Sequence, residues 1–556
     1  MRRFAELFSR LDETNKTSAK KQALVDYFAA APADDAAWAV RFLVGDRPKR
    51  AVATKTLTDA VCAAADIPTW LFDECYEQAG DLSETLALLL PGASSTPTPP
   101  SLTAFVETRL LPLKALDAEA AMASVRESWG MLEPQERLVF NKLLGGSFRV
   151  GVAKGVVVQA LAAAADVDTA TIAARLVGGI EATAAAFAAL TAPASTTDTT
   201  DATTTTTTTD PAKPYPFFLA SPIPGAHPES LGPPAAFVIE PKWDGIRAQL
   251  VVRDVDGEKR AWLWSRGEEE VSAAFPDVIA AARSLPAGTV LDGELLAWDV
   301  EDDVVRSFND LQQRLNRKKP SAKLVTDTPV RLLTYDLLEE GGVDLRAQPI
   351  AERRRRLELL APAHGFAISE RLHADSWADL DARWQQSRSL GVEGFMLKAI
   401  DSPYRAGRVR GEWWKWKVAP LSVDCVLVYA QKGSGKRAGL YSDYTFAVWD
   451  RPASSSSEAA PRQLVTFAKA YSGLTDDELK KVDAFIKRNT TERFGPVRAV
   501  TPTIVVELGF EGINESTRHK SGFAVRFPRI LRLRDDKAAE DADTVDDLRA
   551  LLLPPT

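Results

Sequence analysis

The strongest constraint on the fold of this chain is an abrupt change of composition near its middle. Ser195–Asp210 consists almost wholly of Thr, Asp, Ala and Ser, with an unbroken run of Thr at 203–209. A stretch without large apolar side chains cannot bury enough surface to order itself, and for the same reason a packed polar strand is disfavoured. We therefore predict a flexible linker at 195–211. Folded domains are expected on both sides, because 556 residues exceed what a single core usually supports.

The segment before this linker has helical periodicity. Phe4, Leu7, Phe8 and Leu11 fall at positions i, i+3, i+4 and i+7. Val156–Ala165 is rich in Ala, Val and Leu and lacks the alternation of a strand. We predict an all-α domain over residues 1–194.

The segment after the linker has strand signals. Ile246–Val252 and Ala261–Trp264 flank the turn dipeptide Asp256-Gly257, which predicts a hairpin. From about Asp424 the chain has short strand patterns with glycine-rich connections such as Gln431–Gly435, consistent with a small β-barrel. Further strands are expected at Thr289–Trp298, Val330–Tyr335 and Gly394–Ile400, and a helix at Val271–Leu285. We predict an α/β (α+β) domain at 212–420 and a β-barrel at 421–556.

Charge and cysteine content limit the classes of function. The net charge of −8 argues against nucleic-acid binding only weakly, because the distribution of Lys and Arg matters more than their total. Taken alone, each basic cluster is better explained as a solvated face than as a DNA contact. Three cysteines without a CxxC pair suggest neither a disulfide framework nor a zinc site. No apolar run is long enough for a membrane span or a signal peptide, so we expect a cytoplasmic protein without a membrane partner. The basic clusters are Arg353–Arg356, Arg314–Lys319 with Lys323, and Arg526–Arg534.

The sharpest local feature is Glu240-Pro241-Lys242-Trp243-Asp244-Gly245-Ile246-Arg247. A lysine between a strand and a turn that glycine permits can lie at the floor of a pocket, with its amine directed at a bound phosphate. The unprotonated amine is a good nucleophile toward phosphorus, and a nearby metal or cation favours that form. By itself, Lys-x-Asp-Gly is also compatible with an ordinary surface lysine in a turn.

The segment resembles the nucleotidyl-transfer motif of the covalent nucleotidyltransferases, the superfamily of DNA ligases, RNA ligases and mRNA capping enzymes. The resemblance implies that Lys242 attacks the α-phosphate of a nucleotide and keeps the nucleoside monophosphate as a phosphoramidate. It also implies that Glu240 reads the adenine amino group and that Arg247 contacts ribose or phosphate.

The other motifs of this superfamily follow in the same order. Ser265-Arg266-Gly267 is similar to the motif whose arginine binds nucleotide and DNA phosphate, although Gly267 and Glu268 depart from the usual pattern. Leu291–Leu295 resembles the strand motif in which Glu294 would contact ribose and metal. Tyr335-Asp336 stands where an aromatic residue stacks on the purine, and simple core packing of Tyr335 is an alternative.

Three more motifs complete the resemblance. In Glu393–Lys398 it implies a metal-binding Glu393, Met396 beneath the base and Lys398 on phosphate, where a surface ion pair is the alternative. In Trp413–Lys417, Lys415 and Lys417 share one strand face and would reach the α-phosphate. An upstream arginine belongs to this motif, Arg410 in preference to Arg408. The motif Arg526–Arg529 with Arg534–Lys537 implies that Arg534 and Lys537 orient the pyrophosphate leaving group.

Together the motifs resemble those of the larger ATP-dependent DNA ligases. Ser147–Gly151 and the helix after it are similar to their amino-terminal helical DNA-binding domain, and the predicted barrel would be an OB-fold. The resemblance implies use of ATP with Mg²⁺, Mn²⁺ being possible, and sealing of nicked double-stranded DNA in replication, repair or recombination by a monomer that encircles the duplex. RNA ligases and capping enzymes lack the helical domain. A noncatalytic nucleic-acid clamp would be expected to have lost some of Lys242, Glu294, Glu393, Lys415 and Lys417.

Overall fold

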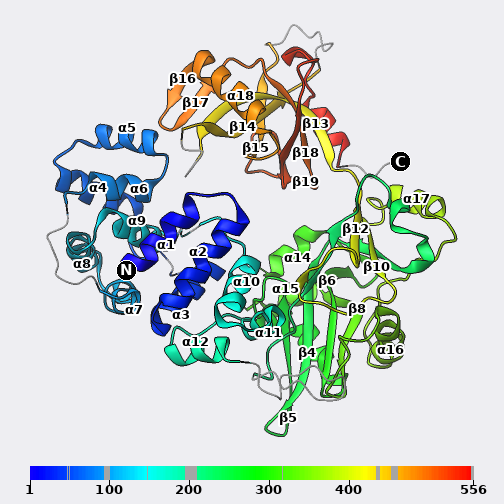
Figure 1. Cartoon of the computed structure of the whole chain (residues 1–556). Helices are drawn as coiled ribbons and strands as arrows, with labels where there is room; N and C mark the ends of the chain where they lie inside the picture. Colours follow the sequence, from blue (N-terminus) through cyan, green and yellow to red (C-terminus); the bar gives the residue numbers. More distant parts are fainter. Residues whose placement is uncertain are drawn as a thin grey trace. The chain divides into compact units, whose positions relative to one another are not determined.

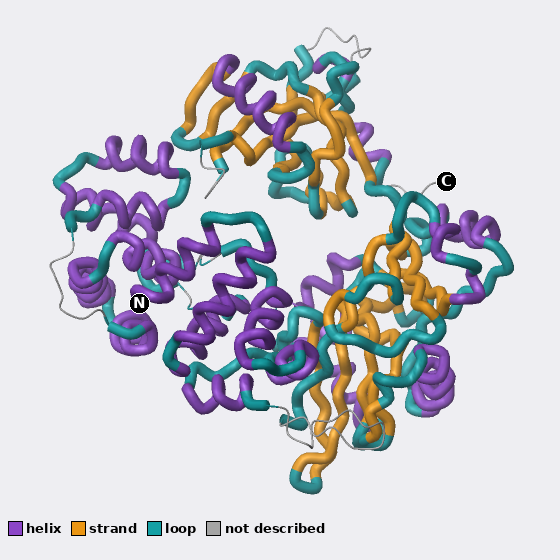
Figure 2. Tube along the Cα trace, in the orientation of Figure 1, coloured by secondary structure: helices purple, strands orange, loops and turns teal. Residues whose placement is uncertain are grey.

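The computed structural model describes residues 1–552 apart from 47, 49, 93–99, 147, 149, 194–209, 316, 318, 434–438 and 453–460. These residues form two compact units, Met1–Val152 with Ala419–Thr556, and Ala153–Val418. All of the predicted linker except Asp210 and Pro211, and part of Ser147–Gly151, lie outside the described residues. The domain bounds stay a prediction. Figure 1 labels the helices and strands, and Figure 2 distinguishes helix, strand and loop by colour.

The amino-terminal part of the first unit is helical, as the periodicity predicts. Phe4, Leu7, Phe8 and Leu11 are all buried on one side of α1, and the ring of Phe4 stacks on that of Phe148 at 5.5 Å between centroids. The helices are α1 (Arg2–Asp12), α2 (Thr17–Ala30), α3 (Ala33–Val44), α4 (Thr54–Ala65), α5 (Thr69–Ala79), α6 (Leu82–Leu89), α7 (Leu102–Phe105), α8 (Ala118–Met131) and α9 (Pro134–Leu144).

The carboxyl-terminal part of the first unit is rich in strands. β15, β14, β13, β17 and β16 lie in this order in one sheet, and β18 joins β13 to β21. The elements are β13 (Leu421–Lys432), β14 (Tyr441–Trp449), β15 (Leu464–Ala470), α18 (Asp476–Asn489), β16 (Thr490–Phe494), β17 (Val497–Val500), β18 (Val505–Phe510), β19 (Gly512–Glu515), β20 (Phe523–Arg526), β21 (Arg529–Leu533) and α19 (Val545–Ala550). One apolar cluster, which includes Leu427, Phe446 and Leu508, forms the core of this part.

The second unit begins with helices and continues as a larger antiparallel sheet and a smaller mixed sheet, in which β2 runs parallel to β12, with flanking helices. α16 packs along β8 (Figure 1). Its helices are α10 (Lys154–Ala165), α11 (Thr169–Arg175), α12 (Ala184–Thr191), α13 (Pro276–Ala281), α14 (Phe308–Leu315), α15 (Ala322–Asp327), α16 (Ile350–Ala363) and α17 (Trp377–Gln385). Across the described part of the chain, no single helix is long and apolar enough to cross a membrane. The helices α10 and α11 meet the length and apolarity criteria only when they are taken together, and the chain bends by 117° between them.

The strands of the second unit confirm the predicted hairpin. In the larger sheet the order is β5-β4-β6-β8-β9, and the loop between β4 and β5 is Asp256-Gly257, with φ of 55° and 80°. Two positive φ angles are those of the type I′ turn that suits strand twist. The smaller sheet has the order β2-β12-β10-β3. The strands are β1 (Phe218–Leu219), β2 (Ser221–Pro222), β3 (Phe237–Trp243), β4 (Ile246–Val255), β5 (Glu258–Ser265), β6 (Thr289–Asp299), β7 (Val304–Val305), β8 (Val330–Glu340), β9 (Val343–Asp344), β10 (Val392–Ala399), β11 (Gly407–Arg408) and β12 (Trp413–Lys417).

The predicted helix at Val271–Leu285 is wrong in its extent. The α-helix covers only Pro276–Ala281, with 3₁₀ turns at Ser272–Ala274 and Ala282–Ser284. Pro276 has no backbone N–H and is tolerated in the first turn of a helix, so it starts a new helix there instead of continuing one.

Two of the basic clusters are partly buried, which contradicts their interpretation as solvated faces. Arg314 is fully buried and pairs with Asp277 at 2.7 Å. On α16, Arg353 and Arg354 are buried, whereas Arg355 and Arg356 stay accessible. The buried arginines follow Ile350 and precede Leu357 on the buried stripe of the helix. Their neighbours are therefore carboxylates and carbonyls of the interior.

Arg353→Met is expected to lower the free energy of unfolding by about 3–5 kcal/mol. Arg353 and Asp336 are both 0% exposed, and their two hydrogen bonds measure 2.8 and 2.9 Å. Removing the arginine leaves a buried carboxylate without its cation. Arg355→Met is the matched control, because Arg355 is 60% exposed and pairs with Glu352 at the surface; its effect should stay below about 1 kcal/mol. Urea unfolding of both variants tests this, and equal losses would contradict it.

Candidate active site

Lys242 lies near the carboxyl end of β3, just before the turn that leads into β4. At Gly245 in this turn, a Cβ atom would collide with the carbonyl oxygen of Leu295 on β6. Glycine at this position therefore lets β3 pass directly into the larger sheet. The turn joins the two sheets of the unit immediately beside the lysine.

One face of the smaller sheet carries six of the predicted site residues. In the strand register, Met396 on β10 lies opposite both Glu240 on β3 and Lys415 on β12. Because side chains alternate along a strand, residues two positions further along share this face. These residues are Lys242 on β3, Lys398 on β10 and Lys417 on β12.

The opposite face of this sheet is apolar. Ile239, Phe395 and Trp416 pack there with Trp377 and Leu380 of α17. The predicted division of β12 into a lysine face and a packed face is therefore present. Trp413 is an exception, because it lies in register on the lysine face, yet it is buried against Val251 and Val290 of the larger sheet.

Lys242 forms an ion pair with Glu393. Its Nζ donates to Glu393 Oε2, and Lys417 Nζ lies 3.6 Å from the same oxygen. The register of β10 against β3 shifts between Val392 and Phe395, which brings Glu393 to the lysine side. Gly394 permits this, since its φ is 116° and a Cβ atom there would strike the carbonyl oxygen of Trp416.

Glu294 on β6 is the second acidic group of the site. Burial raises its pKa to about 7, although the charges of Lys242, Arg247 and Arg266 act in the opposite direction. Tyr335 donates a hydrogen bond of 3.4 Å from its hydroxyl to Glu294 Oε2. Perturbed carboxylates of this kind concentrate in functional sites.

Glu294→Gln is expected to stabilise the metal-free protein above neutral pH. Because its pKa rises from 4.5 to about 7 on folding, the folded state binds this proton more tightly than the unfolded chain. The free energy of unfolding therefore falls by up to about 3 kcal/mol as the pH rises from about 4.5 to about 7. Glutamine carries no titrating proton at this position and avoids the loss. Denaturation with a chelator should show no difference at about pH 5 and a more stable variant at about pH 8. A difference that does not depend on pH would contradict this.

Lys415 lies in a field of positive charge. Burial lowers its pKa, and the neighbouring charges of Arg408, Lys242, Lys417 and Arg266 lower it further. Arg266, in the turn after β5, is thus near enough to act on both Lys415 and Glu294. Arg408 on β11 is one of the charges that act on Lys415. The preference for Arg410 as the upstream arginine of this motif stays a prediction. Such a cluster of cations suits the phosphates of a nucleotide.

Arg247 is held by a buried network that the sequence did not predict. Its guanidinium donates to both oxygens of Asp292, at 3.2 and 2.7 Å, and to the carbonyl oxygen of Phe218 at 2.6 Å. The hydroxyl of Tyr404 donates to Asp292 Oδ2 at 2.6 Å. Asp292 belongs to the quoted strand motif, whereas nothing in the sequence distinguished Tyr404.

The predicted base-binding residues also lie together. The ammonium of Lys398 is 4.4 Å from the centroid of the Tyr335 ring and 2.6 Å from Glu240 Oε2. Glu240 is 2% exposed, and its other oxygen accepts a hydrogen bond from Arg354. Lys398 thus lies beside the carboxylate in this structure, and its predicted contact with phosphate stays a prediction.

Arg534 and Lys537 belong to the other compact unit, so only their own neighbours are described. Both bind the carboxylate of Asp424 on β13, Lys537 at 2.9 Å. Arg534 also pairs with Asp536 at 2.9 Å. Asp424 was not a candidate from the sequence, because a lone aspartate in a strand pattern carries no signal.

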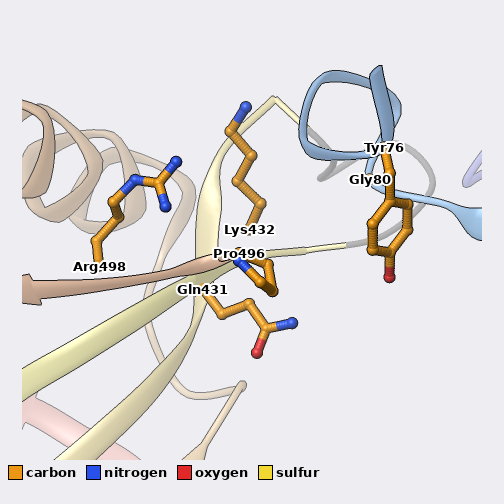
Figure 3. A pocket seen from close by; sticks show the side chains of 6 residues that line it. All are labelled: Tyr76, Gly80, Gln431, Lys432, Pro496 and Arg498. Atoms are coloured by element: carbon orange, nitrogen blue, oxygen red, sulfur yellow. The ribbon is translucent and has the colours of Figure 1, made fainter. Parts of the chain in front are cut away.

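A separate small pocket in the first unit contains none of the predicted site residues. Figure 3 shows its lining by Tyr76 and Gly80 on one side and by Gln431, Lys432, Pro496 and Arg498 on the other. Its volume of about 30 Å³ is close to that of one water molecule. The pocket is too small for a nucleotide.

Known proteins resemble the chain over most of its length. The sequence profile described as "ATP dependent DNA ligase domain" matches residues 218–417, "DNA ligase N terminus" matches 1–162, and "ATP dependent DNA ligase C terminal region" matches 437–537. A "Probable DNA ligase" of Koribacter versatilis is 36% identical over 59% of this chain and 58% of its own length. The chain thus spans less than two thirds of that relative.

Another "Probable DNA ligase", from Anaeromyxobacter sp., is 33% identical over 75% of this chain and 76% of its own length. The solved structure named Pmar-Lig_Pre. covers 96% of this chain and 99% of its own, with a TM-score of 0.61 at 15% identity, which shows a likeness of fold alone. With its helical amino-terminal region, nucleotidyltransferase region and strand-rich carboxyl-terminal region, the chain belongs to the ATP-dependent DNA ligase family.

Proposed function

We propose that this protein seals nicks in duplex DNA, joining a 3′-hydroxyl to a 5′-phosphate at the expense of ATP, in replication, repair or recombination. The observation that carries the proposal is the environment of Lys242. It lies on a strand face with Lys415 and Lys417, and its charge acts on Glu294 and Lys415, as does that of Arg266. An amine among phosphate-binding cations and acidic groups suits covalent nucleotidyl transfer.

In the first step Lys242 Nζ attacks the α-phosphorus of ATP. A nitrogen–phosphorus bond forms, the bond from the α-phosphorus to its bridging oxygen breaks, and pyrophosphate leaves. Glu393 Oε2, which accepts a hydrogen bond from Lys242 Nζ, is placed to receive the proton of the amine. Lys415 and Lys417 would balance the charge on the α-phosphate oxygens. Tyr335 and Met396 would enclose the base, with Glu240 at its amino group.

The donor set fits a magnesium ion that is shared with the substrate. Among the described residues no cluster of three or more His, Cys, Asp or Glu forms a metal site. Glu294 and Glu393 would hold Mg²⁺, or Mn²⁺, together with phosphate oxygens, as is usual for Mg²⁺ at nucleotides. When bound, the ion neutralises charge that builds up on the phosphates.

Two further displacements would complete the reaction. An oxygen of the 5′-phosphate at the nick attacks the phosphorus of the bound AMP, and Lys242 leaves with its nitrogen. The 3′-hydroxyl then attacks the 5′-phosphate, and AMP leaves as the phosphodiester bond forms. Each is an in-line displacement that depends mainly on positioning and on nearby cations.

The other regions of the chain would hold the DNA. The helical amino-terminal region would bind the duplex, and the strand-rich carboxyl-terminal region would be an OB-fold that presents Arg534 and Lys537 to the pyrophosphate before it turns to the DNA. We infer a monomer that closes around the nick, since the three family regions occur together in one chain.

The test is to incubate the protein with Mg²⁺ and α-labelled ATP or GTP, and then with a nicked DNA duplex or a nicked RNA duplex. Label on the denatured protein from ATP, and a sealed DNA strand, are the expected results. Label without DNA sealing would point to an RNA ligase or capping-type enzyme. Absence of label on the protein with both nucleotides would indicate a noncatalytic nucleic-acid clamp.

A further inference from the structure

The carboxylate of Glu240 is enclosed by two cations in the interior of the second unit. Arg354 Nη1 donates to Glu240 Oε1, and Lys398 Nζ lies 2.6 Å from Oε2. The three side chains are only 2–4% exposed. Each carboxylate oxygen therefore has a cation of its own.

Arg354 also connects Glu240 to the surroundings of Lys242. Its Nη2 donates to the carbonyl oxygen of Ser369, and the hydroxyl of Ser369 accepts a hydrogen bond of 2.9 Å from Trp243 Nε1. The N–H of Ser369 donates to the carbonyl oxygen of Thr334, next to Tyr335, at 2.8 Å. One guanidinium thus ties α16 to β3 and to the residue before Tyr335.

The enclosure of Glu240 by Arg354 and Lys398 affects which base, adenine or guanine, the carboxylate can accept a hydrogen bond from. An ionised carboxylate can only accept hydrogen bonds. Adenine offers an amino group at the position where guanine offers a carbonyl oxygen, so a carboxylate fixed at this edge accepts from adenine and repels guanine. The planar fork of an arginine fixes the direction of the carboxylate as well as its charge, which a flexible lysine does less well.

We propose that Arg354 is a positioning residue that sets the preference for ATP over GTP. It holds the Glu240 carboxylate, which can only accept hydrogen bonds, in a fixed orientation toward the base. The inference rests on the proposed function, since it assumes that Glu240 reads the base. Arg354 itself need not touch the nucleotide.

The experiment measures self-nucleotidylylation by the full chain with α-labelled ATP and α-labelled GTP. For Arg354→Met, KM for ATP should rise about tenfold or more, because the charge-assisted hydrogen bond that holds Glu240 in place is lost. The maximal rate should change less. The ratio of kcat/KM for ATP to that for GTP should fall by about tenfold. Arg354→Lys keeps the charge and should give intermediate values. Arg355→Met is the control on the same helix, because Arg355 is exposed.

A double-mutant cycle separates this role from a general loss of structure. If Arg354 acts through Glu240, then Arg354→Met should change the ATP-to-GTP ratio little in a Glu240→Gln background. If the methionine variant does not fold, the same cycle is measured with Arg354→Lys, whose effect on the ATP-to-GTP ratio should likewise be small in the Glu240→Gln background. An unchanged KM and ratio in the folded variant would overturn the proposal, and so would equal effects in both backgrounds. Wild type that takes no label from either nucleotide would instead overturn the proposed function.

Discussion

Lys242→Ala is expected to abolish label on the protein and to abolish sealing of a nick from ATP. The amine is the group that would carry AMP, and it donates a hydrogen bond to Glu393 Oε2, the oxygen that also lies 3.6 Å from Lys417 Nζ. Loss of a nucleophile removes at least roughly 10⁴-fold of the rate. The measurement is the initial rate of label transfer from α-labelled ATP, followed by gel analysis of the nicked strand.

The controls make this result specific. Lys323→Ala removes an exposed lysine of the same unit and should leave both rates unchanged. Lys242→Ala should still seal a nick that already carries AMP on its 5′-phosphate, because the last displacement uses the 3′-hydroxyl and not the lysine. If the variant kept the label, another residue would be the nucleophile, and the assignment of Lys242 would be wrong.

The sequence predicts which of the candidate residues share a strand face, because these residues lie in short strands. In Trp413–Lys417 the two-residue period alone places Lys415 and Lys417 on one face, and the structure agrees. The hairpin around Asp256-Gly257 is similarly local, since the turn residues determine its geometry. Both features depend on neighbours in sequence, which is why the sequence predicts them.

The missed features depend on packing between distant segments. The sequence pattern predicts that Arg353 and Arg354 belong to a solvated cluster, because four consecutive arginines suggest a surface. The available signal was their spacing, since they fall on the same helical stripe as Ile350 and Leu357. Only the fold shows that carboxylates such as Asp336 meet them there.

The raised pKa of Glu294 has a similar origin. Strand β6 predicts that Glu294 lies on a particular face, but burial of that face comes from the packing of one sheet on the other. The choice between Arg408 and Arg410 also depends on long-range structure, because β11 pairs with β1 and so brings Arg408 near Lys415. Neither feature could be derived from a local pattern.

Lys537→Ala is expected to slow self-adenylylation by about 100-fold or more, because a cation that would stabilise the departing pyrophosphate is removed. Burial opposes its charge, but hydrogen bonding to Asp424 and the charge of Asp543 raise the pKa of Lys537, so it stays a cation. In this structure Asp424 holds both Lys537 and Arg534. To act on pyrophosphate, the two cations must exchange this carboxylate for the phosphates.

The prediction distinguishes steps of one reaction, because pyrophosphate leaves only in the first. Lys537→Ala should therefore seal a pre-adenylylated nick within a few-fold of the wild-type rate, while its labelling from ATP is slow. Lys481→Ala is the matched control, since Lys481 is 62% exposed and pairs with Asp535 at the surface; it should affect neither step. If Lys537→Ala slowed both steps equally, its role would lie in DNA binding or in folding of the strand-rich region. If Lys537→Ala slowed only the sealing step, Lys537 would contact the DNA, and Arg534 would be the residue that stabilises the departing pyrophosphate.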